Sequence, residues 1–445
     1  MTATTTQEKE TDYLIIGAGA MGIAFADEIF SRKPQLKITI IDRREKAGGH
    51  WNDAYPFVRL HQPAAFYGVN SLVLGNGSND LSSKTELLAY YDKIMEKFLA
   101  SGRVEFLAEH DYLGDGKVVS LKNPAQRYTY KINKSLVDGT YMKVEVPSTH
   151  APKYKVGAGV HLLPVNELLH SHDKWEKFYV VGSGKTGMDA ILFLLDKEVP
   201  VENIFWISPN DSWLFNRAFI QEGSVAEEVL KHGDCMKVAQ KSEEIFLEME
   251  KKGGILRLDK KISPGKWRCA TVSPEELEKL QTIRQVIRLG RVKSISPTDI
   301  EFEEGKLAYS GKALFVHCSA NGLAKRKKVP IFSDGKITLQ SILFCQQVFS
   351  AATIARLSLA NISEKRKNQL TPVPHPEYKE DWPKAYSTSI NNLLLVHKVF
   401  PLWMFRSRLN FMSHEPMLTY FAYAAKAMLM APALEKAAKR MPALH

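Results

Sequence analysis

The sequence predicts an α/β protein with two parallel-sheet domains, one inserted into the other, and a helical region at the C-terminus. Three observations predict this. An apolar strand, a glycine-rich turn and a helix follow one another near the N-terminus, the same order recurs in the middle of the chain, and the last third contains long apolar stretches with helical spacing. The 445 residues also exceed what one ordinary core holds, which favours two or more domains.

A nucleotide-binding turn is predicted at residues 17–22. Residues 13–16 are an apolar strand, the next six read GAGAMG and match GxGxxG, and a helical stretch follows. In such a turn Gly17 allows a tight bend, Gly19 lets the backbone approach a pyrophosphate, and Gly22 lets the helix pack closely on the sheet. The order of strand, turn and helix therefore indicates a Rossmann-like dinucleotide site.

An acidic residue completes this first unit. Residues 37–41 form a second strand that ends in Asp42, about 20 residues after the last glycine, where a carboxylate can accept both hydroxyls of an adenosine ribose. The residues predicted to bind the first dinucleotide are Gly17, Gly19, Ala20, Met21, Gly22, Asp42 and Arg43.

The overall charge and the cysteines narrow the class of protein. A formal net charge of +11 favours anionic small partners such as phosphate-bearing cofactors, and the basic residues are too dispersed to predict a nucleic-acid partner. Cys235, Cys269, Cys318 and Cys345 lie far apart without a CxxC pair. This spacing predicts no disulfide framework, no metal site and no dithiol redox centre. With a polar head over residues 1–11 and no secretory signal, we expect a cytoplasmic protein.

A loop rich in aromatic and hydrogen-bonding groups follows the first unit. Residues 48–51 read GGHW, so Gly49 brings backbone close to a ligand and Trp51 offers a flat face. Residues 53–71 have neither helical nor strand periodicity, and such a segment usually lines a site. Arg59, His61 and Gln62 are the catalytic candidates. The alternative is a packed loop in which Arg59 and His61 satisfy backbone carbonyls.

The next part of the chain is predicted to be scaffold. Residues 85–99 have helical spacing with Thr85 as the cap, and residues 104–107 together with several segments between 112 and 146 are predicted strands.

A second nucleotide-binding unit begins at residue 178. An apolar strand over 178–181 leads into residues 182–187, which read GSGKTG, and a helix follows over 188–195. A P-loop is excluded because the glycine that GxxxxGK[ST] requires before Gly184 is absent. The residues predicted to bind the second dinucleotide are Gly182, Ser183, Gly184, Lys185, Thr186 and Gly187.

The second strand of this unit predicts which nicotinamide cofactor binds. Residues 203–207 end in Ser208 and Asn210 rather than in an acid, and Arg217 follows. A missing ribose acid with a nearby arginine favours a phosphorylated ribose, hence NADPH, with NADH as the alternative. Arg217 pairing with Asp211 instead is a second alternative.

Helices are predicted over 242–251 and 273–287, and strands over 290–302, 306–310 and 313–318.

Two dinucleotide sites in one chain suggest a flavin that stays bound and a nicotinamide that exchanges. The two glycine-rich turns, the GGHW loop and their order resemble the class B flavin-dependent monooxygenases, which include flavin-containing, Baeyer-Villiger and N-hydroxylating monooxygenases. The resemblance spans residues 12 to 325, and the strand over 313–318 is similar to the one that returns to the FAD domain in that group, which implies that Ala320, Asn321 and Gly322 contact a cofactor. The FxGxxxHxxx(W/Y) signature of that group is only partly matched, by Gly157 and His161.

The resemblance implies an FAD-dependent, NADPH-using monooxygenase that acts on a small molecule with O2 through a flavin hydroperoxide. Arg59 is then expected to stabilise negative charge on the reduced or peroxy flavin. His61 and Gln62 are expected to form hydrogen bonds near the reactive edge of the flavin, and Trp51 is expected to pack against its ring. A flavin reductase or dehydrogenase without oxygen transfer is one alternative, favoured by the incomplete signature. A non-catalytic NADPH-binding sensor is another.

The resemblance also implies the domain boundaries. We expect an FAD-binding domain over 10–165 and 310–375, an NAD(P)H-binding domain over 166–309, and a helical C-terminal region over 376–445. In that last region, residues 391–405 and 417–440 are apolar helical stretches. The stretch over 417–432 is too short for a membrane span and is interrupted by Lys426, so no transmembrane segment is predicted. A peripheral membrane contact or a homodimer interface stays open.

Overall fold

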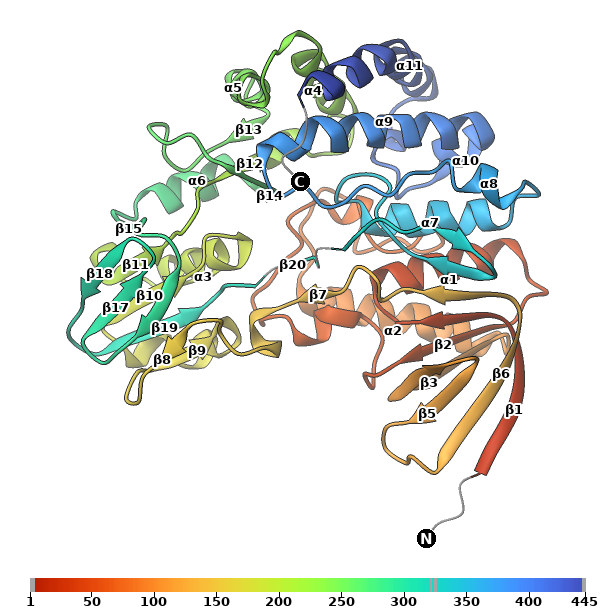
Figure 1. Cartoon of the computed structure of the whole chain (residues 1–445), viewed down its shortest axis with the longest axis horizontal. Helices are drawn as coiled ribbons and strands as arrows, with labels where there is room; N and C mark the ends of the chain where they lie inside the picture. The colour runs from red at the N-terminus through yellow and green to blue at the C-terminus, as the bar shows by residue number, and fades with distance from the viewer. Residues whose placement is uncertain (1–4, 321, 324–325, 442–445) are drawn as a thin grey trace.

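The computed structural model describes residues 5–320, 322–323 and 326–441. Two separate sheets, one mixed and one fully parallel, form two lobes, and a largely helical layer lies across both of them (Figure 1). The α/β class predicted from the sequence, with two Rossmann-like units and a helical C-terminal region, is confirmed.

The first sheet contains the N-terminal unit. Its main path is β21-β22-β6-β1-β2-β3, in which β1, β2, β3, β6 and β22 run parallel, and a hairpin of β4 and β5 is added at β6. Its strands are β1 (Thr5–Ile16), β2 (Ile38–Asp42), β3 (Val104–Ala108), β4 (His110–Gly114), β5 (Lys117–Ser120), β6 (Gln126–Asp138), β21 (Phe332–Ser333) and β22 (Lys336–Thr338). The helices beside it are α1 (Ala20–Arg32), α2 (Lys84–Ala100), α7 (Gln347–Ser358) and α8 (Glu364–Lys367).

The second sheet contains the mid-chain unit and is fully parallel, in the order β15-β11-β10-β19-β9. Its elements are β9 (Leu162–Pro164), β10 (Lys177–Val181), α3 (Lys185–Asp196), β11 (Ile204–Ile207), α6 (Pro274–Gln281), β15 (Gln285–Ile287) and β19 (Ala313–His317). A four-stranded sheet packs on one face through a shared apolar cluster and is made of β8 (Lys155–Val156), β16 (Val292–Ile295), β17 (Asp299–Phe302) and β18 (Gly305–Ala308).

The helical layer combines the C-terminal region with a segment from inside the second unit. Residues 212–272 form a small sheet and two helices whose buried side chains share a core with the C-terminal helices. The elements of this layer are β12 (Ser212–Asn216), α4 (Val225–Val238), α5 (Ser242–Lys251), β13 (Ile255–Leu256), β14 (Lys266–Val272), α9 (Trp382–Val399), α10 (Pro401–Arg406) and α11 (Met417–Arg440).

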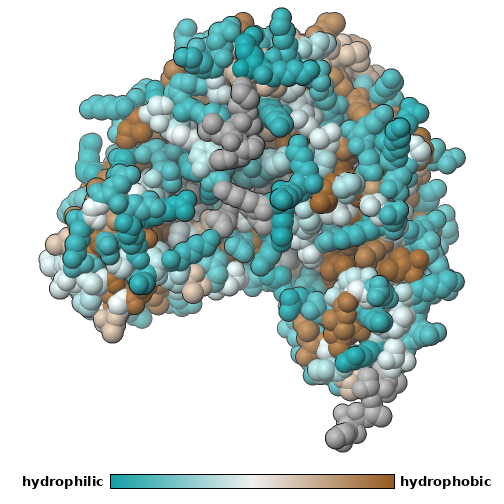
Figure 2. Space-filling view, in the orientation of Figure 1, coloured by the Kyte–Doolittle hydropathy of each residue, from teal (hydrophilic) through white to brown (hydrophobic). Residues whose placement is uncertain are grey.

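Two connections join the lobes. The outgoing chain forms β7 (Val144–Glu145) and the returning chain forms β20 (Gly322–Leu323), and these two short strands pair antiparallel between the lobes. The molecule is visibly hollowed between the lobe that carries β10 and the lobe that carries β1 (Figure 2).

Several boundaries differ from the sequence-based expectation. Strands β8 and β9 lie before residue 166 but pair with β16 and β19, so the chain enters the second unit earlier than expected. Strand β1 begins at Thr5, because the polar head pairs in parallel with β6 along its length. Helix α2 is capped by Ser83, whose hydroxyl accepts from the Glu86 N–H, rather than by Thr85.

Two predicted helices also have different ends. The helix expected over 273–287 ends at Gln281, and residues 285–287 join the second sheet beside β11. Helix α11 continues through Pro432 to Arg440, so its 24 residues are long and apolar enough to cross a membrane by length and composition alone. The argument from length against a span is therefore wrong, although α11 packs on α9 and α4 within the folded protein.

Candidate functional site

One large cavity lies where the two glycine-rich turns face each other. Its volume is about 1550 Å³, and both the first turn (Gly17 to Met21) and the second turn (Gly182 to Thr186) line it. A pocket for one drug-sized ligand has roughly 300–1,000 Å³. The cavity is therefore large enough for parts of two cofactors.

The first turn has the geometry that a pyrophosphate requires. Gly17 adopts φ +97°, and a Cβ on Gly22 would lie 1.9 Å from the Gly17 carbonyl oxygen, so neither position accepts a side chain. A Cβ on Gly49 would lie 2.9 Å from Gly19 Cα, which shows how closely the GGHW loop approaches the turn. Helix α1 begins at Ala20 with no side-chain cap, so its first N–H groups are available to an anion.

Asp42 lies at the end of β2, beside the turn. It is buried; its Oδ2 accepts from the Ala18 N–H at 2.7 Å and its Oδ1 accepts from the Arg44 N–H at 2.8 Å. Each carboxylate oxygen can accept further bonds, so the group holds the turn in place and still lines the cavity. Arg43 also lines the cavity, with Asp111 3.8 Å from its guanidinium.

The second turn repeats this geometry. Gly182 adopts φ +130°, and a Cβ on Gly187 would lie 2.0 Å from the Gly182 carbonyl oxygen. A Cβ on Gly184 would meet no protein atom within 4 Å, so the space in front of it belongs to the cavity. Helix α3 begins at Lys185, again without a side-chain cap.

Side chains from the first domain reach this second turn. The Tyr55 hydroxyl donates to Asp189 Oδ2 at 2.5 Å, and Asp189 also forms an ion pair with Lys185. Burial and the Asp189 carboxylate raise the pKa of Tyr55 well above its usual value, so it remains a donor. Phe57 stacks on Phe193 with 4.3 Å between ring centroids. These contacts hold the loop over residues 53–62 against α3.

Of the three residues predicted to recognise the nicotinamide ribose, Asn210 lines the cavity, whereas Ser208 and Arg217 are buried and do not. The hydroxyls of Ser183 and Ser208 donate to the Asn210 carbonyl at 2.8 and 3.3 Å, which shapes the loop after β11. Arg217 is buried and does not line the cavity. It donates to the carbonyls of His61 and Thr271 and pairs with Glu276 at 2.8 Å. Contrary to expectation, Arg217 is thus not positioned to hold a ribose phosphate, and Asp211 pairs instead with Arg288 at 2.9 Å.

The three catalytic candidates all line the cavity. Arg59 is exposed and donates to the Leu81 carbonyl at 3.0 Å. Burial, with the nearby charges of Lys185 and Arg217, lowers the pKa of His61 to about 4, so the imidazole is neutral at pH 7. Its Nδ1 is buried and has no hydrogen-bond partner among the described residues. Gln62 accepts from Gln346 Nε2 at 3.1 Å, just before α7.

Trp51 and the loop after β19 line other parts of the cavity wall. Trp51 lies in a 3-10 helix over residues 49–53, is buried, and donates from Nε1 to the Tyr67 hydroxyl at 2.8 Å. Ala320 and Gly322 line the cavity after β19, whereas Asn321 lies outside the described residues. His161 does not line it, and its ring packs on Trp175 with 4.5 Å between centroids.

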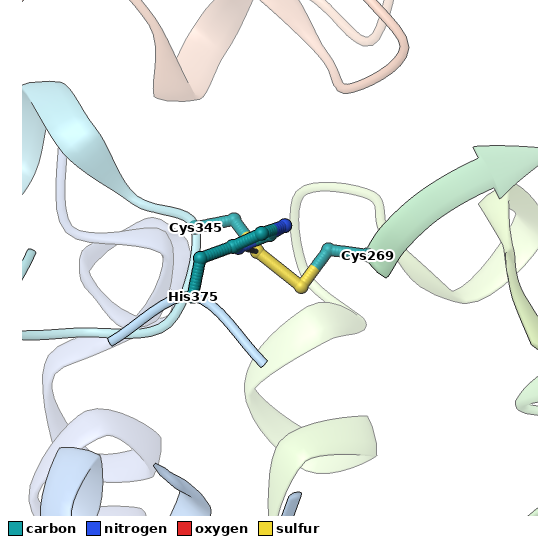
Figure 3. A group of neighbouring side chains, drawn as sticks. All are labelled: Cys269, Cys345 and His375. Carbon is teal, nitrogen blue, oxygen red and sulfur yellow. Dashed lines mark hydrogen bonds between the residues drawn. A yellow bond between two sulfur atoms is a disulfide. The ribbon is translucent and has the colours of Figure 1, made fainter. Parts of the chain in front are cut away.

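A disulfide lines the same cavity, contrary to the prediction made from the cysteine spacing. Cys269 and Cys345 are joined, with 6.8 Å between their Cα atoms and a separation of 76 positions in the chain (Figure 3). His375 lies against the bridge, its Nδ1 3.5 Å from Cys345 Sγ, and the three groups are the one potential metal-donor cluster among the described residues. This pairing could not be predicted from the sequence, because the two cysteines are far apart in the chain and only the fold brings β14 beside the loop before α7.

Comparisons with known proteins agree with this architecture. A model of the NAD(P)-binding Rossmann-like domain matches residues 15–76. The chain is 39% identical over 433 residues to uncharacterized protein Rv2000 of Mycobacterium tuberculosis, covering 92% of this chain and 80% of that protein. It is 25% identical over 192 residues to the probable FAD-binding monooxygenase AlmA of Acinetobacter baylyi, covering 41% and 38% of the two chains.

A solved structure shares the fold of nearly the whole chain. Polycyclic ketone monooxygenase from Thermothelomyces thermophila superimposes with a TM-score of 0.53 at 12% identity, covering 97% of this chain and 88% of that one. At this identity the match concerns the fold, including the inserted second unit and the helical layer.

Proposed function

We propose that this chain, which belongs to the same family as the uncharacterized protein Rv2000, is a divergent member of the class B flavin-dependent monooxygenase-like FAD/NAD(P)-binding oxidoreductases and acts as a single-component, NADPH-using monooxygenase. Its substrate is a small molecule, its co-substrate is O2, and its location is cytoplasmic. The observation that carries the proposal is that two complete dinucleotide turns open into one cavity.

FAD fits the first turn. Gly17, Gly19 and the uncapped start of α1 would hold its pyrophosphate, and Asp42 would hold the adenosine ribose, with Gly49 and Trp51 placing backbone and an indole against the rest of the cofactor. When bound, FAD supplies the two-electron and oxygen chemistry, and the protein supplies positions and charges.

NADPH fits the second turn, where Gly182 and Gly184 leave room for its pyrophosphate. Lys185 adds a positive charge at the start of α3, and its partner Asp189 is held by Tyr55. The loop that carries Tyr55 continues into Arg59, His61 and Gln62, so one segment connects the two cofactor sites. Neutral His61 and the amide of Gln62 are groups that can exchange hydrogen bonds there without adding charge.

Arg291 replaces Arg217 as the proposed recogniser of the 2′-phosphate. It lines the cavity just beyond β15, the strand that neighbours β11. We expect Arg291→Ala to raise the KM for NADPH by about 10- to 100-fold and to leave NADH use unchanged, because one charge-assisted contact contributes roughly 1.5–3 kcal/mol and each 1.4 kcal/mol is tenfold. Steady-state rates with both nucleotides measure this.

Exposed Arg284, on the other side of β15 and away from the cavity, provides the matched control. Arg284→Ala should alter neither KM. An equal effect of both variants would mean that general positive charge, rather than Arg291, attracts the phosphate.

Anaerobic reduction by NADPH and then by NADH, followed by rapid mixing with oxygen, tests the oxygenase itself. A spectrally distinct, long-lived species between reduced and oxidised flavin supports oxygen transfer. Direct return to oxidised flavin supports the reductase alternative, and a colourless protein supports the sensor. If Arg59→Ala and Gln62→Ala leave flavin reduction and turnover unchanged, the reaction centre lies elsewhere in the cavity.

Helix α11 is the proposed contact with a membrane surface. Leu418 and Leu429 are each 83% exposed and Met428 is 60% exposed, and the basic residues Lys436 and Lys439 follow on the same helix. Exposed apolar side chains beside basic ones favour a peripheral contact with anionic lipid.

Vesicle sedimentation provides the test of this contact. We expect wild-type protein to sediment with anionic vesicles and Leu418→Ser/Leu429→Ser protein to sediment at most one tenth as well, since each leucine contributes roughly 1.5–3 kcal/mol when buried. Loss of a dimer in the same variant, with no vesicle binding by wild type, would identify a homodimer face instead.

A further inference from the structure

The Cys269–Cys345 disulfide lies within the cofactor cavity and beside its proposed reaction centre. Cys345 directly precedes Gln346, whose side-chain amide donates to Gln62 at 3.1 Å. Both cysteines, His375 and Gln346 line the cavity that contains the two glycine-rich turns. The sulfurs thus lie in the wall of the cavity proposed to hold both cofactors.

The backbone at both ends of the bridge is unusual. Cys269 has φ +55° and lies where the pairing of β14 with β12 shifts register, and Phe344, next to Cys345, has φ +37°. Residues other than glycine rarely adopt this conformation, and residues held in it concentrate at functional sites. Bulges in strands commonly redirect a side chain towards a site. Here the irregularity presents Cys269 to the cavity.

Groups that assist thiol chemistry surround the bridge. His375 lies across it with Nδ1 3.5 Å from Cys345 Sγ (Figure 3). The Nδ1 atom of its imidazole faces this sulfur and can exchange a proton with it. Cys345 also precedes the N-terminus of the 12-residue helix α7, where a thiolate is stabilised.

The other two cysteines have a different character. Cys235 and Cys318 are free and buried, and burial raises the pKa of each thiol. They are therefore poor nucleophiles, and the chemistry is confined to one pair. In a compartment that keeps thiols reduced, the disulfides that do form are usually transient and catalytic or redox-sensing.

We propose that Cys269 and Cys345 form a redox-active disulfide that accepts two electrons from the reduced flavin. This inference rests on the proposed use of FAD and NADPH. In the step, two electrons break the S–S bond, one sulfur takes a proton to become a thiol, and the other becomes a thiolate. The flavin is reoxidised, and NADPH is the original donor of the electron pair. His375 carries the proton to and from the sulfurs.

Counting thiols before and after reduction tests the proposal without measuring turnover. FAD-loaded protein is denatured in an alkylating reagent, before and after anaerobic NADPH, and its alkylated cysteines are identified by mass spectrometry. We expect Cys235 and Cys318 alone to be labelled before NADPH, and Cys269 and Cys345 in addition afterwards. Wild-type protein should consume about two equivalents of NADPH per FAD, and Cys345→Ser protein about one, because the second electron pair has no acceptor. The matched control Cys235→Ser should still consume two.

Two results would overturn the inference. If NADPH reduces the flavin while Cys269 and Cys345 stay joined, the bridge is structural. If all four cysteines are labelled before reduction, the oxidised protein has no bridge, and release of a metal ion on denaturation would then explain the cluster. A flavin that NADPH cannot reduce overturns the proposed function instead, and photoreduction of bound FAD then tests the bridge independently.

A separate measurement tests the role of His375 as the proton carrier. Flavin reduction by NADPH should proceed at the wild-type rate in His375→Ala protein, whereas the new thiols should appear at least tenfold more slowly, since a positioned proton carrier contributes about 10²–10⁴ in rate. Equal slowing of both phases would mean that the imidazole only supports the local structure.

Discussion

Gly22→Ala is expected to produce a protein without bound FAD. The new Cβ would lie 1.9 Å from the Gly17 carbonyl oxygen, a backbone atom that can move only if the turn or the start of α1 moves. Overpacking of this kind costs about 1–3 kcal/mol or more of folding free energy, and the displaced turn no longer fits a pyrophosphate. We expect bound FAD to fall below about one tenth of the wild-type content, measured from the flavin absorbance per protein chain.

A glycine outside the cofactor sites provides the control for this result. Gly265 has no heavy atom within 4 Å of an added Cβ, so Gly265→Ala should bind FAD normally. Full FAD content in Gly22→Ala protein would mean that the first turn does not form the flavin site.

Gly184→Ala is expected to separate ligand binding from folding. An added Cβ there meets no protein atom within 4 Å, but it projects into the cavity where the backbone must approach a pyrophosphate. The FAD content and the melting temperature should therefore match the wild type. The KM for NADPH should rise by about 10- to 100-fold, because losing close backbone hydrogen bonds to a charged group removes roughly 1.5–3 kcal/mol.

The test is a rapid-mixing measurement of flavin reduction across a range of NADPH concentrations, which shows how strongly NADPH binds. The same substitution should weaken NADH to a similar degree, because both nucleotides share the pyrophosphate, whereas Arg291→Ala should affect NADPH alone. A drop in melting temperature, or unchanged NADPH affinity, would contradict the assignment of the second turn.

The two nucleotide turns were predictable because their determinants are contiguous in the chain. Gly17, Gly22, Gly182 and Gly187 lie in two six-residue segments, and each turn needs only the strand before it and the helix after it. Local backbone chemistry therefore specifies them: Gly17 has a positive φ, and a Cβ on Gly22, Gly182 or Gly187 would meet backbone. Residues 53–71 were also predicted, from their composition, to line a site, and Arg59, His61 and Tyr67 of this segment line the cavity.

Pairings between distant segments could not be predicted in this way. Arg217 was assigned to a ribose phosphate by its place after β11, yet Glu276 and two carbonyls surround it in the folded chain. The polar head over residues 5–12 continues β1 because β6 offers it a partner. Helix α11 passes through Pro432, with buried residues on both sides of it, and packs on α4 and α9, contacts that the local sequence does not reveal.

The amino-acid sequence by itself determined the fold class and the two dinucleotide turns, since each depends on short segments whose residues are neighbours in the chain. Only the tertiary structure decided that Cys269 meets Cys345, that His375 lies against them, and that Arg291 rather than Arg217 faces the cavity. The physical reason is that a side chain's partners depend on which distant strands and loops the sheets bring together, and local sequence does not encode that arrangement.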